Sequence, residues 1–282
     1  MTQGPLQSLI NGRQAQHISV RDRGFQYGDG CFETVRIIAN KPILWPAHLE
    51  RLQRACTVLK LPADLDALQS EISAILQSQE LAHAVLKVTI SRGEGGRGYK
   101  PASAPDCTRV LQLFDYTRPD THVGARVMVC QHRLSASVQL AGIKHLNRLD
   151  QVLASAEIPE GFDEGLCLDQ DGFVVEGCKS NIILVVDQAM LAPELSRCGV
   201  EGVMLNHLVT EFAKREHSVA RKRITLEQLQ QADEIFLCNS VFGVWPLVEL
   251  IDESAESYWS SEIGPNSRAA MAIANELFLN DD

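Results

Sequence analysis

Short apolar runs recur through the chain between clusters of turn-forming residues, and this pattern restricts the possible folds more than any other feature. Runs of this length that are rich in β-branched residues are typical of strands. Two adjacent amphipathic helices interrupt them, one opened by Pro46 and one over residues 64–79. Their apolar faces carry Leu49, Leu52, Cys56 and Leu59, and then Leu65, Leu68, Ile72 and Ile75. Strands with two helices inserted together predict an α/β fold with α+β character.

Individual strands and turns can be assigned in both halves. "SLINGRQ" predicts a hairpin with Asn11-Gly12 as its turn, and Asn40-Lys41 is expected to turn the chain within "CFETVRIIANKPILW". "AVLKVTIS" and "RVLQLFD" are the next strands. The second half contributes "RVMVCQ", "GLCLD", "FVVE", "NIILVV", "EIFLC" and "VWPLVEL", with a turn at 169–172. Helices are expected near 146–158, 203–216 and 266–279.

The length of the chain favours two domains. It has 282 residues, of which 45% are hydrophobic, enough for more than one core. The sequence turns polar from Tyr116 to Gly124, with Pro119 in the middle. We place the linker there, between an N-terminal α/β domain over residues 1–117 and a larger C-terminal domain over residues 124–282.

Charge and cysteine content exclude several classes of function. The net charge of −10 argues against binding nucleic acid, and no basic run suggests a membrane surface. The longest clean apolar run, 182–186, is too short to span a bilayer, and the N-terminus does not resemble a signal peptide. Eight cysteines without a C-x-x-C pair are interpreted as small buried hydrophobes of a cytoplasmic protein. The scattered histidines predict no metal site.

Lys144 stands in an unusual setting for a charged side chain. The uncharged Ala141, Gly142 and Ile143 precede it, and a helix is expected to follow at once. That helix would carry Leu146, Leu149, Val152 and Leu153 on one face. A poorly hydrated ammonium loses its proton more easily, so this position suits a nucleophilic lysine. The alternative is an ordinary surface lysine.

A glycine-rich stretch matches a dinucleotide-binding pattern only superficially. Residues 93–98, "GEGGRG", follow a strand and fit G-x-G-x-x-G, but Pro101 and Pro105 prevent the helix that such a site requires. We interpret the stretch as a mobile loop that brings Arg97 to an anion, since a guanidinium pairs well with a carboxylate. A loop without a function is the alternative.

Three further positions carry polar groups at the ends of apolar segments. Glu176 ends a buried strand, where a carboxylate needs a cation or a donor, although it could also cap a turn. Gly202-Val203-Met204 opens a helix whose N–H groups could hold an anion. Asn239-Ser240 ends another strand, with a simple strand end as the alternative. Together with Lys144, these groups are the components of a pyridoxal phosphate site.

Four ordered motifs resemble those of a known family. "RDRGFQYGDGCFETVR", "ISRGEGGRGY", "GIKHLNRLDQ" and "VVEGCKSNIILV" look like the branched-chain and D-amino-acid aminotransferase-like family, the fold type IV pyridoxal phosphate enzymes. The resemblance runs from about Leu9 to about Pro246. It implies a homodimer of two-domain chains, with the smaller domain N-terminal and pyridoxal 5'-phosphate bound between the domains.

The resemblance also implies roles for individual residues. Lys144 would carry the cofactor covalently and transfer protons, and Glu176 would face the pyridine nitrogen. The cofactor phosphate would be held by Arg51, Gly202, Val203, Met204, Asn239 and Ser240, and Asn181 would belong to the cofactor site.

Within the family, "IKHLNRL", "SRGEGGRGY" and "GDGCFET" are most similar to the lyases that convert 4-amino-4-deoxychorismate to 4-aminobenzoate and pyruvate in folate biosynthesis. That similarity implies that Thr34 assists proton transfer. Arg97, Tyr99, Phe32 and Arg148 are the expected substrate residues. Phe32 and Thr34 share a face of a regular strand, which leaves Glu33 on the other.

Two other functions remain open. Some aminotransferase relatives carry a glutamate at the position of Glu33, so an aminotransferase acting on D- or branched-chain amino acids is the first alternative. The second is an interaction protein that retains the fold without the cofactor.

Overall fold

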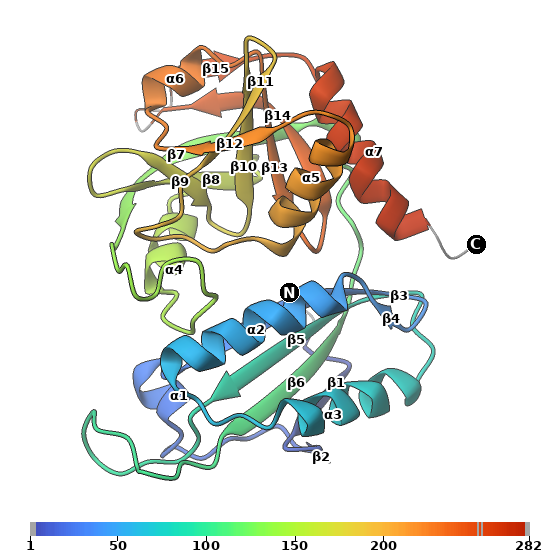
Figure 1. Cartoon of the computed structure of the whole chain (residues 1–282), viewed down its shortest axis with the longest axis vertical. Helices are drawn as coiled ribbons and strands as arrows, with labels where there is room; N and C mark the ends of the chain where they lie inside the picture. Colours follow the sequence, from blue (N-terminus) through green and yellow to red (C-terminus); the bar gives the residue numbers. More distant parts are fainter. Residues whose placement is uncertain (1–3, 253, 255, 280–282) are drawn as a thin grey trace. The chain divides into compact units, whose positions relative to one another are not determined.

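The computed structural model describes residues 4–252, 254 and 256–279. It divides into two compact units (Figure 1). Among the described residues, unit 1 comprises 4–118 and 143–147, and unit 2 comprises 119–142 and the residues from 148 onward. The boundaries at 117 and 124 stay a prediction. The short segment 143–147, which carries Lys144, belongs to unit 1 although it comes from the second half of the chain.

Unit 1 is an antiparallel sheet with helices (Figure 1). Its six strands follow the order β2-β1-β6-β5-β3-β4. The strands are β1 (Gln7–Ile10), β2 (Arg13–Gln14), β3 (Gly30–Ile38), β4 (Lys41–Pro42), β5 (His83–Ser91) and β6 (Thr108–Asp115). The helices are α1 (Arg23–Tyr27), α2 (Trp45–Leu59) and α3 (Leu65–Gln77). The two helices inserted between strands are therefore confirmed as α2 and α3, whereas the short α1 was not predicted.

The two hairpins of unit 1 test the turn predictions. Asn11 and Gly12 both have positive φ and join β1 to β2, as predicted. The second turn was placed one residue too late: Ala39 and Asn40 have positive φ, and Ile38 pairs with Lys41. A two-residue hairpin turn needs positive φ at both central residues, which asparagine tolerates well. The Asn40 amide also donates to the carbonyl of Gln79 at 2.7 Å.

Strand β3 separates two chemically different faces of the sheet. Its pairing with β5 is unbroken from Gly30 to Ile38, so side chains alternate regularly. Cys31, Glu33 and Val35 are buried on the face against which α2 packs. Phe32 and Thr34 are half-buried on the other face. The prediction that Phe32 and Thr34 share a face is confirmed.

Two glycines allow segment 143–147 to lie along the open edge of β3. The Phe32 N–H donates to the Lys144 carbonyl at 2.9 Å, and the Leu146 N–H donates to the Gly30 carbonyl at 3.0 Å. A Cβ on Gly30 would lie 2.7 Å from the Leu146 side chain, and one on Gly28 would lie 2.5 Å from Asn147 Oδ1. The two glycines of "GDG" therefore allow the backbone of this segment to come within hydrogen-bonding distance of the sheet.

Unit 2 is built on a mixed sheet of nine strands (Figure 1). The order is β12-β11-β10-β13-β14-β7-β8-β9, with β15 beside β14. The strands are β7 (Ala125–Leu134), β8 (Glu164–Asp169), β9 (Val174–Gly177), β10 (Asn181–Val186), β11 (Ala189–Pro193), β12 (Val219–Lys222), β13 (Glu234–Asn239), β14 (Gly243–Ile251) and β15 (Ser257–Ser260). A 3₁₀ turn (Thr121–Val123) and helices α4 (Leu149–Ala156), α5 (Val203–Lys214), α6 (Leu226–Gln230) and α7 (Pro265–Leu279) complete it. None of the helices within the described residues has the length and apolar character needed to cross a bilayer.

The prediction of a helix over 146–158 was wrong at its start. Helix α4 begins at Leu149, five residues after Lys144, and Lys144 lies outside any helix or strand. The expected apolar face does not enter a core within the chain, because Leu149, Val152 and Leu153 are 68%, 60% and 46% exposed. Backbone pairing of residues 144 and 146 with β3 takes the place of the first helical turn.

Candidate functional site

Lys144 lies beside an aromatic ring on the half-buried face of β3. Its Nζ is 4.6 Å from the centroid of the Phe32 ring, and the side chain is half-buried. The carbonyl of Lys144 accepts from the Phe32 N–H, so the backbone fixes the two residues relative to each other. The structure thus brings together Lys144 and Phe32 from distant parts of the sequence.

Lys87 joins this group, although the sequence did not single it out. It lies opposite Thr34 in the β3–β5 pairing, and directly opposed residues point to the same face of a sheet. Its Nζ is 5.6 Å from the Phe32 centroid. Phe32, Thr34, Lys87 and Lys144 therefore form one cluster, which we call the β3 face. The signal available in the sequence was a charged residue between two apolar ones, Leu86 and Val88, in the predicted strand "AVLKVTIS".

Glu33 is turned away from the β3 face and is held by two side chains of α2. Arg51 donates through Nε to Oε1 at 2.7 Å and through a terminal nitrogen to Oε2 at 2.5 Å. His48 Nδ1 donates to Oε2 at 2.7 Å. Burial alone would raise the pKa of Glu33, but the charge and hydrogen bonds of Arg51 and the bond from His48 lower it to about 2. Glu33 is therefore an ionised structural carboxylate, and the role of Arg51 toward a phosphate stays a prediction.

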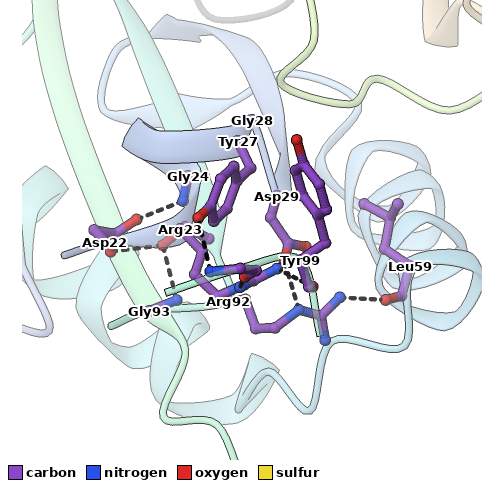
Figure 2. A network of polar contacts seen from close by, with 12 residues as sticks. Asp22, Arg23, Gly24, Tyr27, Gly28, Asp29, Leu59, Arg92, Gly93 and Tyr99 are labelled. Carbon is purple, nitrogen blue, oxygen red and sulfur yellow. Dashed lines mark hydrogen bonds and ion pairs between the residues drawn. The ribbon is translucent and has the colours of Figure 1, made fainter. Parts of the chain in front are cut away.

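Residues 93–99 form a loop that a buried arginine holds in place (Figure 2). Arg23 donates to the carbonyls of Gly98 at 3.0 Å and Tyr99 at 2.7 Å. Its Nε donates to Asp29 Oδ2 at 2.8 Å, and Arg92 donates to the same oxygen at 2.8 Å. These two arginines lower the pKa of Asp29 against the effect of burial. Two of the motifs that carry the family resemblance, one around residue 23 and one around residue 93, are thus joined directly.

The loop presents Arg97 and Tyr99, two of the four residues that the sequence assigned to substrate binding. No helix lies between Ser91 and Thr108, so the prediction that no helix follows the glycine-rich stretch is confirmed. Arg97 is exposed, and Tyr99 is 84% exposed while its ring lies 5.5 Å from that of Tyr27. The backbone on both sides of Arg97 is therefore tied down while its side chain points to solvent.

In unit 2, Glu176 organises the loop that leads into α5. It is almost fully buried at the end of β9, and its Oε2 accepts from the Val200 N–H at 2.8 Å. Arg148 is close enough to Glu176 for a charge interaction, and its expected role in substrate binding stays a prediction. Burial lowers the pKa of Arg148, and the carboxylates of Glu176 and Asp150 oppose that change. A carboxylate in this environment suits a buried cationic partner.

The start of α5 has the features of an anion site. Gly202 caps the helix without a side-chain bond, and the first N–H groups belong to Val203 and Met204. Asn181 Nδ2 donates to the Val200 carbonyl at 2.9 Å, so Asn181 supports this loop. A Cβ on Gly202 would lie 1.8 Å from Asn181 Oδ1, which excludes any larger residue here. The N–H donors at this helix start suit a phosphate group.

Asn239 and Ser240 occupy a tight turn between β13 and β14. Asn239 Oδ1 accepts from the N–H groups of Val241 and Phe242, both at 2.9 Å, and its Nδ2 donates to the Lys179 carbonyl at 3.0 Å. The Asn239 side chain is thus used to shape the turn. Ser240 is half-buried, and its role as a phosphate donor stays a prediction.

Comparison with known proteins places these features in a family. Residues 30–250 match the amino-transferase class IV model. An aminodeoxychorismate lyase from Vibrio harveyi is 35% identical over 84% of this chain and 89% of its own length. The crystal structure of 4-amino-4-deoxychorismate lyase from Pseudomonas aeruginosa is 40% identical, with a TM-score of 0.86 over 97% of this chain and 98% of that chain.

An aminotransferase has the same fold at lower identity. The branched-chain aminotransferase of Thermoproteus uzoniensis superposes with a TM-score of 0.86 at 20% identity, over 99% of this chain and 97% of that chain. The two-domain fold type IV architecture is therefore confirmed. The chain belongs to the class IV aminotransferase family, whose cofactor is pyridoxal 5'-phosphate.

Proposed function

We propose that the protein is a pyridoxal-phosphate-dependent lyase that converts 4-amino-4-deoxychorismate to 4-aminobenzoate and pyruvate. One structural observation carries the proposal: the β3 face places Lys144 beside Phe32 on the same side as the Thr34 hydroxyl, and Glu33 is turned away. The similarity to two lyases, at 35% and 40% identity, supports it.

Lys144 and Thr34 have the roles that move protons. When bound, pyridoxal phosphate supplies an electron sink conjugated with the substrate nitrogen. Lys144 Nζ would hold the cofactor aldehyde at rest and would take the proton from the amine-bearing carbon of the substrate. The Thr34 hydroxyl would donate a proton to the oxygen whose bond to the substrate ring breaks, so that this oxygen leaves in enolpyruvate, which becomes pyruvate. The ring becomes aromatic in this step, so the protein mainly positions the reacting groups.

Cations near the β3 face recognise the two carboxylates of the substrate. The Lys87 ammonium lies next to the Phe32 ring and would meet one of them. Arg97 would reach the other from its loop, with Tyr99 beside it and Phe32 packing against the substrate ring. Arg148 is assigned to support of Glu176, because its charge interacts with that carboxylate.

The other predicted site residues would contact the cofactor or support those that do. Glu176 would keep the pyridine nitrogen protonated. The N–H groups of Val203 and Met204 at the glycine-capped start of α5 would hold the phosphate, together with Ser240 and Arg51. Asn181 and Asn239 would act indirectly, by shaping the two phosphate segments.

An acceptor-free assay tests the lyase. The purified protein is mixed with 4-amino-4-deoxychorismate, and 4-aminobenzoate and pyruvate are measured without any keto acid. We expect both products in equal amounts. Lys144→Ala should lose the borohydride-reducible chromophore and nearly all turnover, whereas Lys222→Ala, at an exposed strand position, should keep both. Turnover that depends on a keto-acid acceptor would instead establish an aminotransferase, and a colourless wild-type protein would exclude both enzymes.

We also propose that the protein is a cytoplasmic homodimer. Leu149, Val152 and Leu153 of α4 and Val138, eleven residues before that helix, expose apolar side chains that a second copy would cover. The eight cysteines are unpaired, which suits a reducing compartment. Sedimentation of the wild type should give twice the chain mass, and a Val152→Asp/Leu153→Asp variant should shift toward the monomer. A wild type that sediments as a monomer would contradict the dimer.

A further inference from the structure

Three thiols from neighbouring strands of unit 2 meet at one point. Cys130 lies on β7, Cys167 on β8, and Cys178 directly follows β9. Their sulfur atoms all lie within 4.8 Å of one another, and the Sγ atoms of Cys167 and Cys178 are 3.7 Å apart. Within the described part of the chain, these residues are the one group of three or more potential metal ligands that meets this distance.

The surrounding structure makes room for the sulfurs. Gly165 lies beneath them, since a Cβ there would come within 2.5 Å of Cys130 Sγ and 3.0 Å of Cys178 Sγ. The Cys178 N–H donates to the Gly165 carbonyl at 2.9 Å, which fixes the third thiol against β8. On the other side, Cys130 Sγ lies 3.5 Å from the Ala154 carbonyl of α4. Backbone contacts therefore hold the Cys130 thiol on one side and the backbone of Cys178 on the other.

The spacing matches the coordination of a thiophilic metal ion. With a metal–sulfur bond of about 2.3 Å, sulfurs are about 3.8 Å apart in a tetrahedral site and about 4.0 Å apart in a trigonal one. The 3.7 Å separation of Cys167 and Cys178 agrees with either. We propose that Cys130, Cys167 and Cys178 form a three-thiolate site for a soft cation of the zinc group. Binding releases three thiol protons and leaves one coordination position open in a tetrahedral ion.

Exposure indicates how an ion would enter. Cys130 and Cys167 are fully buried, whereas Cys178 is half-buried. An ion would therefore meet Cys178 first and then the two deeper sulfurs. All three ligands belong to unit 2, and none of them is among the residues assigned to the cofactor or the substrate, so the site does not depend on the proposed lyase activity.

Cadmium titration of the reduced whole protein tests the site. Under oxygen-free conditions we expect one tight equivalent of Cd²⁺, with the ultraviolet charge-transfer absorption of thiolate-bound cadmium. That equivalent should protect Cys178 from iodoacetamide, as mapped by mass spectrometry. Cys178→Ala and Cys167→Ala should each weaken binding on the order of tenfold or more. Cys198→Ala, a buried cysteine outside the trio, is the matched control and should bind like the wild type.

Two results would overturn the proposal. One is a wild type without a stoichiometric charge-transfer signal, because the cluster is then only packed core. The other is full binding in folded Cys178→Ala, because the ion then lies elsewhere. If the alanine variants do not fold, the alkylation of wild-type Cys178 decides: unchanged labelling at one equivalent of cadmium contradicts the site.

Discussion

Glu33 in unit 1 and Glu164 in unit 2 are equally buried but differ in charge state. Each side chain is 1% exposed. The pKa of Glu33 is lowered to about 2, whereas burial raises the pKa of Glu164 to about 7. Glu33 has Arg51 and His48 in direct contact. Glu164 accepts from two neutral donors, Ser180 Oγ at 2.9 Å and its neighbour's N–H, that of Gly165, at 3.1 Å.

The difference between these two residues follows from the cations bonded to Glu33, since both carboxylates are buried to the same depth. Lys179 lies near Glu164 and opposes the rise of its pKa, but its Nζ donates to the Asp163 carbonyl at 2.9 Å. At Glu164, whose described hydrogen bonds come from two neutral donors, desolvation dominates. Unit 1 therefore stabilises its core with ion pairs, whereas unit 2 keeps a carboxyl group that changes charge near neutral pH.

Removing the charge of Glu33 should have the largest effect. Glu33→Gln leaves the Arg51 guanidinium buried without its carboxylate, so we expect a loss of about 3–5 kcal/mol in the free energy of urea unfolding at pH 7. The loss should shrink as the pH falls toward 2, since wild-type Glu33 is then protonated as well. As a control, Glu50→Gln changes an exposed residue next to Arg51 on α2 and should change stability by less than about 0.5 kcal/mol. A small effect of Glu33→Gln would remove the contrast between the units.

Glu164→Gln is expected to raise the free energy of unfolding at alkaline pH, whereas Glu33→Gln lowers it at neutral pH. Folded Glu164 binds a proton more tightly than the unfolded chain does, so its contribution to wild-type stability falls as the pH rises from 4.5 to about 7. At pH 8 the neutral variant should be more stable than the wild type by about 2–3 kcal/mol, and near pH 4.5 the two should be nearly equal. Urea unfolding at both pH values measures this. A variant that is less stable at pH 8 would indicate that Glu164 is ionised and well paired.

Ser180→Ala tests how much one neutral hydrogen bond stabilises the ionised form of Glu164. The substitution removes one donor to Glu164, so we expect a loss of about 1–2 kcal/mol at pH 8, where the carboxyl is ionised. The loss should be smaller near pH 5, and a carbon-13 resonance of Glu164 should titrate at higher pH than in the wild type. Ser260→Ala, at an exposed strand end, provides the control and should change neither quantity.

The smallest change in stability is expected for Arg23→Lys in unit 1. Lysine keeps the charge near Asp29 but cannot bond Asp29, Gly98 and Tyr99 together, because it lacks the planar fork. We expect a loss of about 1 kcal/mol in stability, with faster hydrogen exchange confined to residues 94–99. Arg21→Lys, 65% exposed, should leave exchange unchanged. Unaltered exchange in Arg23→Lys would mean that the loop does not depend on this network.

Local patterns predicted most strands and failed where distant segments meet. Residues 181–186 form β10 as predicted, because a short apolar run bounded by polar residues fits a buried strand. The helix expected from 146 lost its first turn, because residues 144 and 146 pair with β3 instead. The periodicity of apolar residues cannot reveal such pairing, since the partner strand lies more than a hundred residues earlier in the sequence.

By itself, the sequence determined the alternation that puts Phe32 and Thr34 on one face, the loop that excludes a dinucleotide site, and the family. Those features depend on neighbours along the chain, whose chemistry is readable residue by residue. Only the tertiary structure decided that Lys87 and Lys144 share the β3 face, that the pKa of Glu33 is lowered while that of Glu164 is raised, and that the sulfur atoms of Cys130, Cys167 and Cys178 lie close together. Each of these depends on distances between strands and on the local loss of water, and both are set by how the sheets assemble.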